Sequence, residues 1–315
     1  MTGCGTTTYT DPDDYRVNVP GAAIDLVLTS SAAFKARVTW VKLRRLTLVL
    51  VDEAAPHIAF VSLDPARISI TFPVRGEPVW NGVRLRRSDF VVRDTGERFH
   101  QSAEGATRWG LISLRASDLA RYVRTLLGSE FTLPQPGQFL RSRSKAAAEV
   151  LRLHAQACRL ATTRQDLVAH REVTRSLEQQ LIVALVSLLG SDEGRLRPGT
   201  ERRRAEAMLR FQDALACQPR QQRLPALCAA IGVPQRTLRI CCEQFLGRSP
   251  LDYARLRRLN LARSALSKAD HEMVSIAGVA RLHGFPEPGR FAGAYRALFG
   301  ETPSATLQRH AAESA

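Results

Sequence analysis

The sequence predicts an α+β protein of two domains, a β-rich domain with trailing helices followed by an all-α domain. Short strand-like runs separated by turn residues extend from Thr39 to Leu114, and helical periodicity begins near Ser117 and continues to the end. With 315 residues, 44% of them hydrophobic, the chain can build two cores. We expect the first domain over residues 1–190, a linker at 191–204 and the second domain over 205–310.

Six runs of apolar and β-branched residues carry the strand prediction. Turn signals separate them at the spacing of an antiparallel barrel or sandwich. These signals are Asp64-Pro65, Arg75-Gly76, Asn81-Gly82 and Thr95-Gly96. The predicted strands are 46–51, 58–63, 68–74, 79–85, 90–92 and 111–114.

Apolar residues at helical spacing replace the strand pattern from Ser117 onward. One stripe predicts a first helix and consists of Leu119, Tyr122, Val123, Leu126 and Leu127. Two further helices are expected over 145–160 and 165–189. The apolar face of the last one consists of Leu177, Leu181, Ala184, Leu185 and Leu188. The loop SDEGRLRPGTE, residues 191–201, is the clearest linker.

The charge balance indicates an anionic polymer as partner. The formal net charge is +15, from 45 basic and 30 acidic residues, and nearly all of the basic residues are arginines. A guanidinium group makes bidentate contacts with phosphates and guanine edges, so the excess suits nucleic acid. Codon bias in a GC-rich genome is an alternative explanation of the preference for arginine over lysine, but it does not explain the net charge.

No apolar stretch approaches the length that crosses a bilayer, and the N-terminus MTGCGTTTYTDPDDY lacks a basic start and an apolar core. We therefore expect a cytoplasmic protein without a membrane partner. The six cysteines form no CxxC pairs, which argues against a disulfide framework or a zinc site and predicts free thiols.

The helical region contains the same plan twice. The run LPALCAAIGVPQRTLRICCEQFLG, at about 224–245, predicts a helix, a turn centred on Gly232 and a second helix opened by Pro234. The copy at about 274–299 has its turn at Gly284 and places Phe291 and Tyr295 in its second helix. This is a duplicated helix-turn-helix.

One long helix, about 250–267, is expected between the two copies. Its predicted buried stripe is Tyr253, Leu256, Leu259, Ala262 and Leu266. Its opposite side is predicted to carry Arg255, Arg257, Arg258 and Arg263. Such a helix would let two recognition helices enter successive major grooves about 34 Å apart.

The second helix of each copy is the predicted reading helix. In the first copy, Gln235, Arg236 and Arg239 lie near its N-terminal end with Ile240 beside them, while Leu238 and Phe245 should pack inward. Arginine pairs with guanine and glutamine with adenine in the major groove. These four exposed positions are therefore the predicted base contacts.

Several short motifs lie in this region at fixed spacing. They are TL in the first copy, then Gly247, Ser249-Pro250 and Tyr253, then RRLNLAR, and IA, GF, RF, YR, FG and PS in the second copy. With these motifs the chain from about Ala205 to Leu307 resembles the DNA-binding domain of the AraC/XylS family of transcription regulators. The resemblance implies binding to promoter double-stranded DNA, activation rather than repression, and contact with RNA polymerase.

The second reading helix departs from the family pattern. It offers Pro288, Gly289, Ala292 and Gly293 where the family shows polar or basic side chains, and these residues supply no bidentate base contact. The remaining cations are Arg290 and Arg296, which are expected to hold phosphates. We therefore predict that the first module supplies most of the specificity and that the second mainly anchors.

The β-rich region resembles, more weakly, the cupin-like sensor domain of the same family, through VRGEPVWNGVRLRRSDFVVRDTGERFH. That resemblance implies a barrel that binds a small-molecule effector, and homodimerisation through the helix at 165–189, whose stripe can equally pack within its own domain. The candidate effector residues are Arg75, Trp80, His100 and Trp109, with core packing as the alternative. Since His57 and His100 are the only histidines before residue 150, no metal or other cofactor is expected.

Two rival functions remain open. Cys241 and Cys242 in the first reading helix lie near arginines, so a thiol-based redox or alkylation sensor is conceivable, although their mid-helix position favours buried, inert thiols. Charge alone would also suit a non-specific architectural DNA-binding protein. No nucleotide-binding loop, nucleophile elbow or carboxylate pair is evident, so we expect no enzyme. The favoured function is an effector-responsive, sequence-specific DNA-binding regulator.

Overall fold

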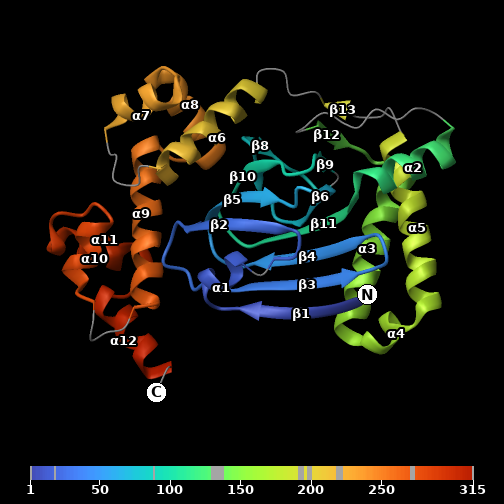
Figure 1. Cartoon of the computed structure of the whole chain (residues 1–315), viewed down its shortest axis with the longest axis horizontal. Helices are drawn as coiled ribbons and strands as arrows, with labels where there is room; N and C mark the ends of the chain where they lie inside the picture. The colour runs from blue at the N-terminus through green and yellow to red at the C-terminus, as the bar shows by residue number, and fades with distance from the viewer. Residues whose placement is uncertain are drawn as a thin grey trace.

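The computed structural model describes residues 2–17, 19–87, 89–128, 138–190, 195–196, 201–217, 223–269 and 274–313. Its elements form successive layers, with helices α2 to α5 on one side, two β-sheets in the middle and helices α6 to α12 on the other side (Figure 1). The predicted two-domain α+β class is confirmed.

The larger sheet is antiparallel and has eight strands. In spatial order they are β1 (Gly3–Tyr9), β3 (Ala36–Lys42), β4 (Thr47–Glu53), β11 (Thr107–Arg115), β6 (Arg67–Arg75), β9 (Asp89–Arg93), β12 (Gln138–Arg141) and β13 (Arg195–Leu196). The smaller antiparallel sheet has five. They are β2 (Ala22–Leu28), β5 (His57–Leu63), β10 (Arg98–Ala103), β7 (Val79–Trp80) and β8 (Val83–Arg84).

The strands do not close into the expected barrel. Each sheet ends in edge strands, β1 and β13 in the larger and β2 and β8 in the smaller, so the two sheets face each other as an open sandwich. All six predicted runs are strands, and the run at 79–85 is a hairpin whose turn, Asn81-Gly82, has positive φ at both residues (48° and 79°). The strands β1, β2, β3, β10, β12 and β13 and the short helix α1 (Pro12–Val17) were not predicted.

Both faces of the larger sheet are buried. On β11, Trp109 and Leu111 point into the core between the sheets, while Ile112 and Leu114 point into the core beneath the helices. The near-continuous apolar runs in the sequence have this cause, because a strand covered on both faces loses the alternation of polar and apolar residues.

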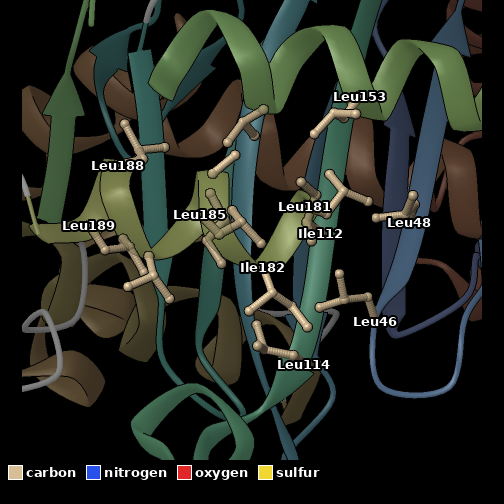
Figure 2. Packing of buried hydrophobic residues seen from close by; sticks show 14 of the residues in the cluster. Leu46, Leu48, Ile112, Leu114, Leu153, Leu181, Ile182, Leu185, Leu188 and Leu189 are labelled. Atoms are coloured by element: carbon tan, nitrogen blue, oxygen red, sulfur yellow. The ribbon is translucent and has the colours of Figure 1, made fainter. Parts of the chain in front are cut away.

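The outer core lies between the larger sheet and the helices α2 (Ala116–Leu127), α3 (Lys145–Thr163) and α5 (Arg171–Gly190). Figure 2 shows the leucine-rich side chains of α5 opposite those of the sheet. The single helix predicted over 165–189 is two, α4 (Gln165–Ala169) and α5, because the backbone is extended at His170. All five residues of the predicted apolar face are buried in this core, so that face packs within its own domain.

The helical part consists of α6 (Glu201–Cys217), α7 (Leu224–Ile231), α8 (Gln235–Leu246), α9 (Pro250–Ser267), α10 (Ile276–Leu282), α11 (Pro288–Phe299) and α12 (Pro303–Glu313). It has two small cores, and α9 contributes to both. Tyr253 packs with α6, α7 and α8, whereas Leu259, Ala262 and Leu266 pack with α10 and α11. The first helix-turn-helix unit lies by the N-terminal end of α9, and the second lies beside its C-terminal half (Figure 1).

The helical part packs on the outer face of the smaller sheet, where Val27 and Ile58 join the core of the first unit. Asn260 of α9 pairs with the backbone of the edge strand β2, accepting from Leu28 N–H at 2.9 Å and donating to Leu28 C=O at 3.1 Å. Arg257 of α9 donates to Asp25 at 3.2 Å. These contacts position both units relative to the sheets.

Candidate nucleic-acid interface

The first unit, which we call module 1 (α7 and α8), is built around a glycine turn. Helix α7 ends at Gly232, whose φ of 69° is the left-handed conformation that glycine adopts without strain, and its N–H donates to Cys228 C=O at 2.9 Å. Pro234 directly precedes α8. One face of α8 is buried, as predicted for Leu238 and Phe245.

The opposite face of α8 is open to solvent. Gln235, Arg236, Arg239 and Ile240 are all exposed, Ile240 by 45%. Thr237 is also exposed in the same first turn, a position that sequence periodicity could have identified. No carboxylate of the described residues pairs with Arg236 or Arg239, so both guanidinium groups are available to an external anion.

The second unit, module 2 (α10 and α11), repeats this construction. Gly284 has a φ of 78°, and the next residue, Phe285, donates its N–H to Ala280 C=O at 2.8 Å. Helix α11 starts at Pro288, where the missing N–H does no harm. Phe291 and Tyr295 are fully buried, and Tyr295 hydroxyl lies 2.8 Å from Thr306 hydroxyl of α12.

The exposed face of α11 consists of small side chains and two arginines. Pro288, Gly289, Arg290 and Arg296 are all exposed, and the space beside Gly289 is empty. Arg290 is paired with Glu287 at 2.9 Å, whereas Arg296 pairs with no carboxylate of the described residues. The face therefore allows close approach of a partner and offers one unpaired guanidinium group.

Two of the four arginines predicted on the exposed side of α9 are not exposed. Arg258 is buried, with its guanidinium 4.9 Å from the Phe285 ring and donating to Gly284 C=O at 3.0 Å. Arg257 is half-buried against Asp25 of the smaller sheet. Arg255 is exposed as expected. The prediction for Arg257 and Arg258 was wrong because neighbouring elements pack against α9 and supply hydrogen-bond acceptors. Asp25 of the smaller sheet accepts from Arg257, and Gly284 C=O of module 2 accepts from Arg258.

The cysteines of α8 are inaccessible. Cys241 and Cys242 are both fully buried. Burial raises the pKa of each thiol, and the neighbouring Cys241 adds to the effect at Cys242. The expectation that at least one of them is buried is confirmed, and neither has the low pKa of a reactive thiol.

Of the four candidate effector residues, only Trp80 and Trp109 are brought together. Trp80 and Trp109 are buried between the sheets with ring centroids 6.4 Å apart, and Trp109 Nε1 donates to the buried Glu53 at 2.9 Å. His100 is buried on the other face of the smaller sheet, with its ring centroid 6.4 Å from that of Phe245 in α8. Arg75 is exposed at the end of β6. Whether any of them contacts an effector stays a prediction.

Within the described ranges, no three histidine, cysteine, aspartate or glutamate side chains gather as metal ligands. No helix of the described part of the chain is long and apolar enough to span a bilayer.

Comparison with known proteins identifies the paired modules. A family model for a helix-turn-helix domain matches residues 227–309. XylDLEGF operon transcriptional activator 2 of Pseudomonas putida is 43% identical over 75 residues, which are 24% of this chain and 48% of that protein. The probable thc operon regulatory protein of Rhodococcus erythropolis is 35% identical over 78 residues, 25% of this chain and 24% of that protein.

These matches span less than half the length of the relatives. Among solved structures, the AraC-like transcriptional activator CuxR aligns over 84% of this chain and 96% of its own, with 14% identity and a TM-score of 0.44, a value too low to establish a shared fold. The sequence matches to α7 through α12 are the informative ones. The C-terminal part of the chain is therefore similar to the helix-turn-helix domain of the AraC/XylS family of transcription regulators.

Proposed function

We propose that the protein is a sequence-specific DNA-binding transcription regulator. One observation carries the proposal: the second helix of each module buries its apolar face and exposes at least one arginine that no carboxylate of the described residues pairs with. Exposed guanidinium groups without an acidic partner on a recognition helix suit the phosphates and base edges of a duplex. The names of the relatives, which are operon activators and a regulatory protein, support the same function.

The two modules divide the work unequally in this proposal. Module 1 offers Gln235, Arg236 and Arg239 on one exposed face, and arginine and glutamine are the side chains that distinguish guanine and adenine. Module 2 offers a face of small side chains on which Arg290 pairs with Glu287, whereas Arg296 pairs with no carboxylate in the described part of the chain. Module 1 thus supplies base contacts and module 2 supplies phosphate contacts.

Helix α9 sets the distance between the modules. Its 18 residues correspond to about 27 Å of helix, and module 1 packs on its N-terminal part while module 2 packs on its C-terminal half. A separation close to one turn of B-DNA lets both modules contact one side of the duplex. A two-block site about one helical turn apart follows from this geometry.

Activation belongs to the same proposal, by analogy with the operon activators. Contact with RNA polymerase, response to a small-molecule effector and homodimerisation are further parts of the proposal, and they depend on the family resemblance alone. The apolar stripe of α5 does not support a dimer, since it is buried within the chain. The thiol-sensor alternative is disfavoured because Cys241 and Cys242 are buried with raised pKa values. The architectural alternative predicts binding without sequence preference.

Selection of genomic fragments by the purified full chain at about 150 mM salt, followed by sequencing, separates these functions. Recovery of one asymmetric site with two blocks about one helical turn apart supports the proposal. Uniform recovery of fragments would instead identify a charge-driven, non-specific binder and would overturn it. Arg44→Ala, at an exposed arginine remote from the modules, is the matched control and should recover the same site.

A further inference from the structure

A cavity of about 450 Å³ lies between helix α3 and the outer face of the larger sheet. Its helix wall is one stripe of α3 formed by Leu151, Ala155, Cys158 and Thr162, which follow the helical repeat. Its sheet wall consists of alternate residues that share one face of neighbouring strands, namely Arg37 and Thr39 of β3, Leu50 and Asp52 of β4, and Phe72 and Val74 of β6. The cavity is thus formed by regular elements rather than by loops.

The floor of the cavity is apolar and firmly packed. The Phe72 ring lies directly over Gly110 of β11, where an added Cβ would be only 2.4 Å from Phe72 Cε2 and 3.0 Å from His154 Cε1. Phe72 itself is fully buried, with its ring centroid 5.0 Å from that of His154. Glycine at position 110 therefore allows two rings to line the base of the cavity.

The deeper polar groups are uncharged at neutral pH. His154 is buried, its Nε2 lies 3.0 Å from Val49 C=O, and burial lowers its pKa to about 4. Burial raises the pKa of the Cys158 thiol to about 12. The inner part of the cavity therefore suits an apolar group and not an ion.

The rim is strongly cationic. Four arginines, Arg37, Arg87, Arg108 and Arg159, line it together with a single carboxylate, that of Asp52. Asp52 binds Arg108 and lies 3.5 Å from Arg37. Within the described part of the chain, no carboxylate pairs with Arg87 or Arg159, and both are exposed. Two guanidinium groups are therefore available to a ligand at the mouth.

We propose that this cavity binds a small organic anion with an apolar body, the body lying over Phe72 and the acidic group lying between Arg87 and Arg159. The volume is within the range of small-molecule sites, and a cationic mouth over an apolar floor selects amphipathic anions over neutral molecules. The site is separate from Arg75, Trp80, His100 and Trp109. Its role as the effector site depends on the proposed function, whereas its occupancy does not.

A matched pair of fluorescent probes tests the proposal. 8-Anilinonaphthalene-1-sulfonate carries a sulfonate, and N-phenyl-1-naphthylamine has the same apolar body without it. We expect the sulfonate probe to bind the full chain with one-to-one saturation. The double variant Arg87→Gln, Arg159→Gln should weaken its binding by roughly tenfold or more and that of the neutral probe by less than about twofold, since only the anion loses charge-assisted contacts.

A second variant tests the position of the site. Ala155→Trp, on the exposed side of α3, places a bulky ring at the mouth and should weaken both probes, whereas Arg75→Gln should weaken neither. Unchanged circular dichroism of the variants establishes that they fold. The proposal is overturned if the sulfonate probe does not saturate, if the double arginine variant weakens both probes alike, or if Arg75→Gln and not Ala155→Trp abolishes binding. Because no DNA is present, loss of DNA binding and loss of the cavity site are distinguishable.

Discussion

At the scale of single residues, Glu53 holds the core between the two sheets. This buried carboxyl group accepts hydrogen bonds from Tyr15 hydroxyl at 2.6 Å, Trp109 Nε1 at 2.9 Å and Thr107 hydroxyl at 3.1 Å. These partners come from α1 and β11, far apart in sequence. The network gives Trp109 a structural role and explains how a polar side chain is accommodated among apolar neighbours.

Glu53→Ala should lower the free energy of unfolding by at least about 3 kcal/mol, because it leaves several buried donors without an acceptor. Urea unfolding measures this loss. The control is Glu77→Ala, since Glu77 and Arg84 form an exposed pair at 4.0 Å that should change stability by less than about 1 kcal/mol. Equal, small losses in the two variants would show that the network contributes little.

The buried ring of His100 makes stability depend on pH. Burial lowers its pKa to about 4, while Gln212 and Asp25 act in the opposite direction. Between pH 6.5 and 4 the unfolded chain binds a proton that the folded chain does not, so stability falls as pH falls through this window. His154 contributes in the same sense.

His100→Phe should therefore reduce the slope of the unfolding free energy against pH by up to about 1.4 kcal/mol per pH unit relative to the natural chain. Urea unfolding at several pH values between 4.5 and 6 gives the two slopes. Identical slopes would mean that His100 is protonated in the folded protein, contrary to its buried position against Phe60 and Phe245.

At the scale of elements, α9 is the shared part of both modules. Arg258 links it to module 2 by stacking on Phe285 and donating to Gly284 C=O in the turn. Arg258→Ala should destabilise module 2 by about 2 to 4 kcal/mol, since it removes a buried hydrogen-bonded cation and its stacking contact. Hydrogen exchange should rise in α10 and α11 and remain unchanged in α7.

Arg255→Ala, at an exposed position one turn away, is the matched control and should leave exchange unaltered. If Arg258→Ala raised exchange equally in both modules, the arginine would stabilise α9 itself rather than its contact with module 2.

The elements differ in how far the sequence predicts them. Both modules and α9 follow from glycine turns and apolar spacing, which are local properties of the chain. Strand β1 was missed because GCGTTTY has no apolar alternation, and it pairs only along one edge. The burial of Arg258 and the cavity beneath α3 depend on neighbours from distant segments. Spacing along one helix gives the direction of a side chain but not its partner.

At the scale of the whole molecule, the contact between the two halves leaves the reading faces free. The C-terminal end of α8 packs on the hairpin of the smaller sheet, where Gly82 lies against Gln244 and Phe245. Gln235, Arg236 and Arg239 at the other end remain exposed. The contact between the halves and the proposed DNA contact therefore use different parts of the same helix.

Asn260 provides the most specific contact across this boundary, since its amide pairs with both backbone groups of Leu28. Asn260→Ala should speed hydrogen exchange of the Leu28 amide by roughly tenfold, because that amide belongs to an edge strand and loses its acceptor. Amides of β5 in the interior of the sheet are the internal reference. Unchanged exchange at Leu28 would show that the halves do not associate in this way in solution.

The unequal division of labour between the modules is the central claim, and fluorescence anisotropy on a selected site and its single-base variants tests it most directly. Arg239→Ala should cost about 1 to 3 kcal/mol of discrimination at particular bases. Arg296→Ala should weaken binding to all sequences alike and reduce the salt slope by about one. Equal loss of base preference in the two variants, or none in Arg239→Ala, would contradict the account.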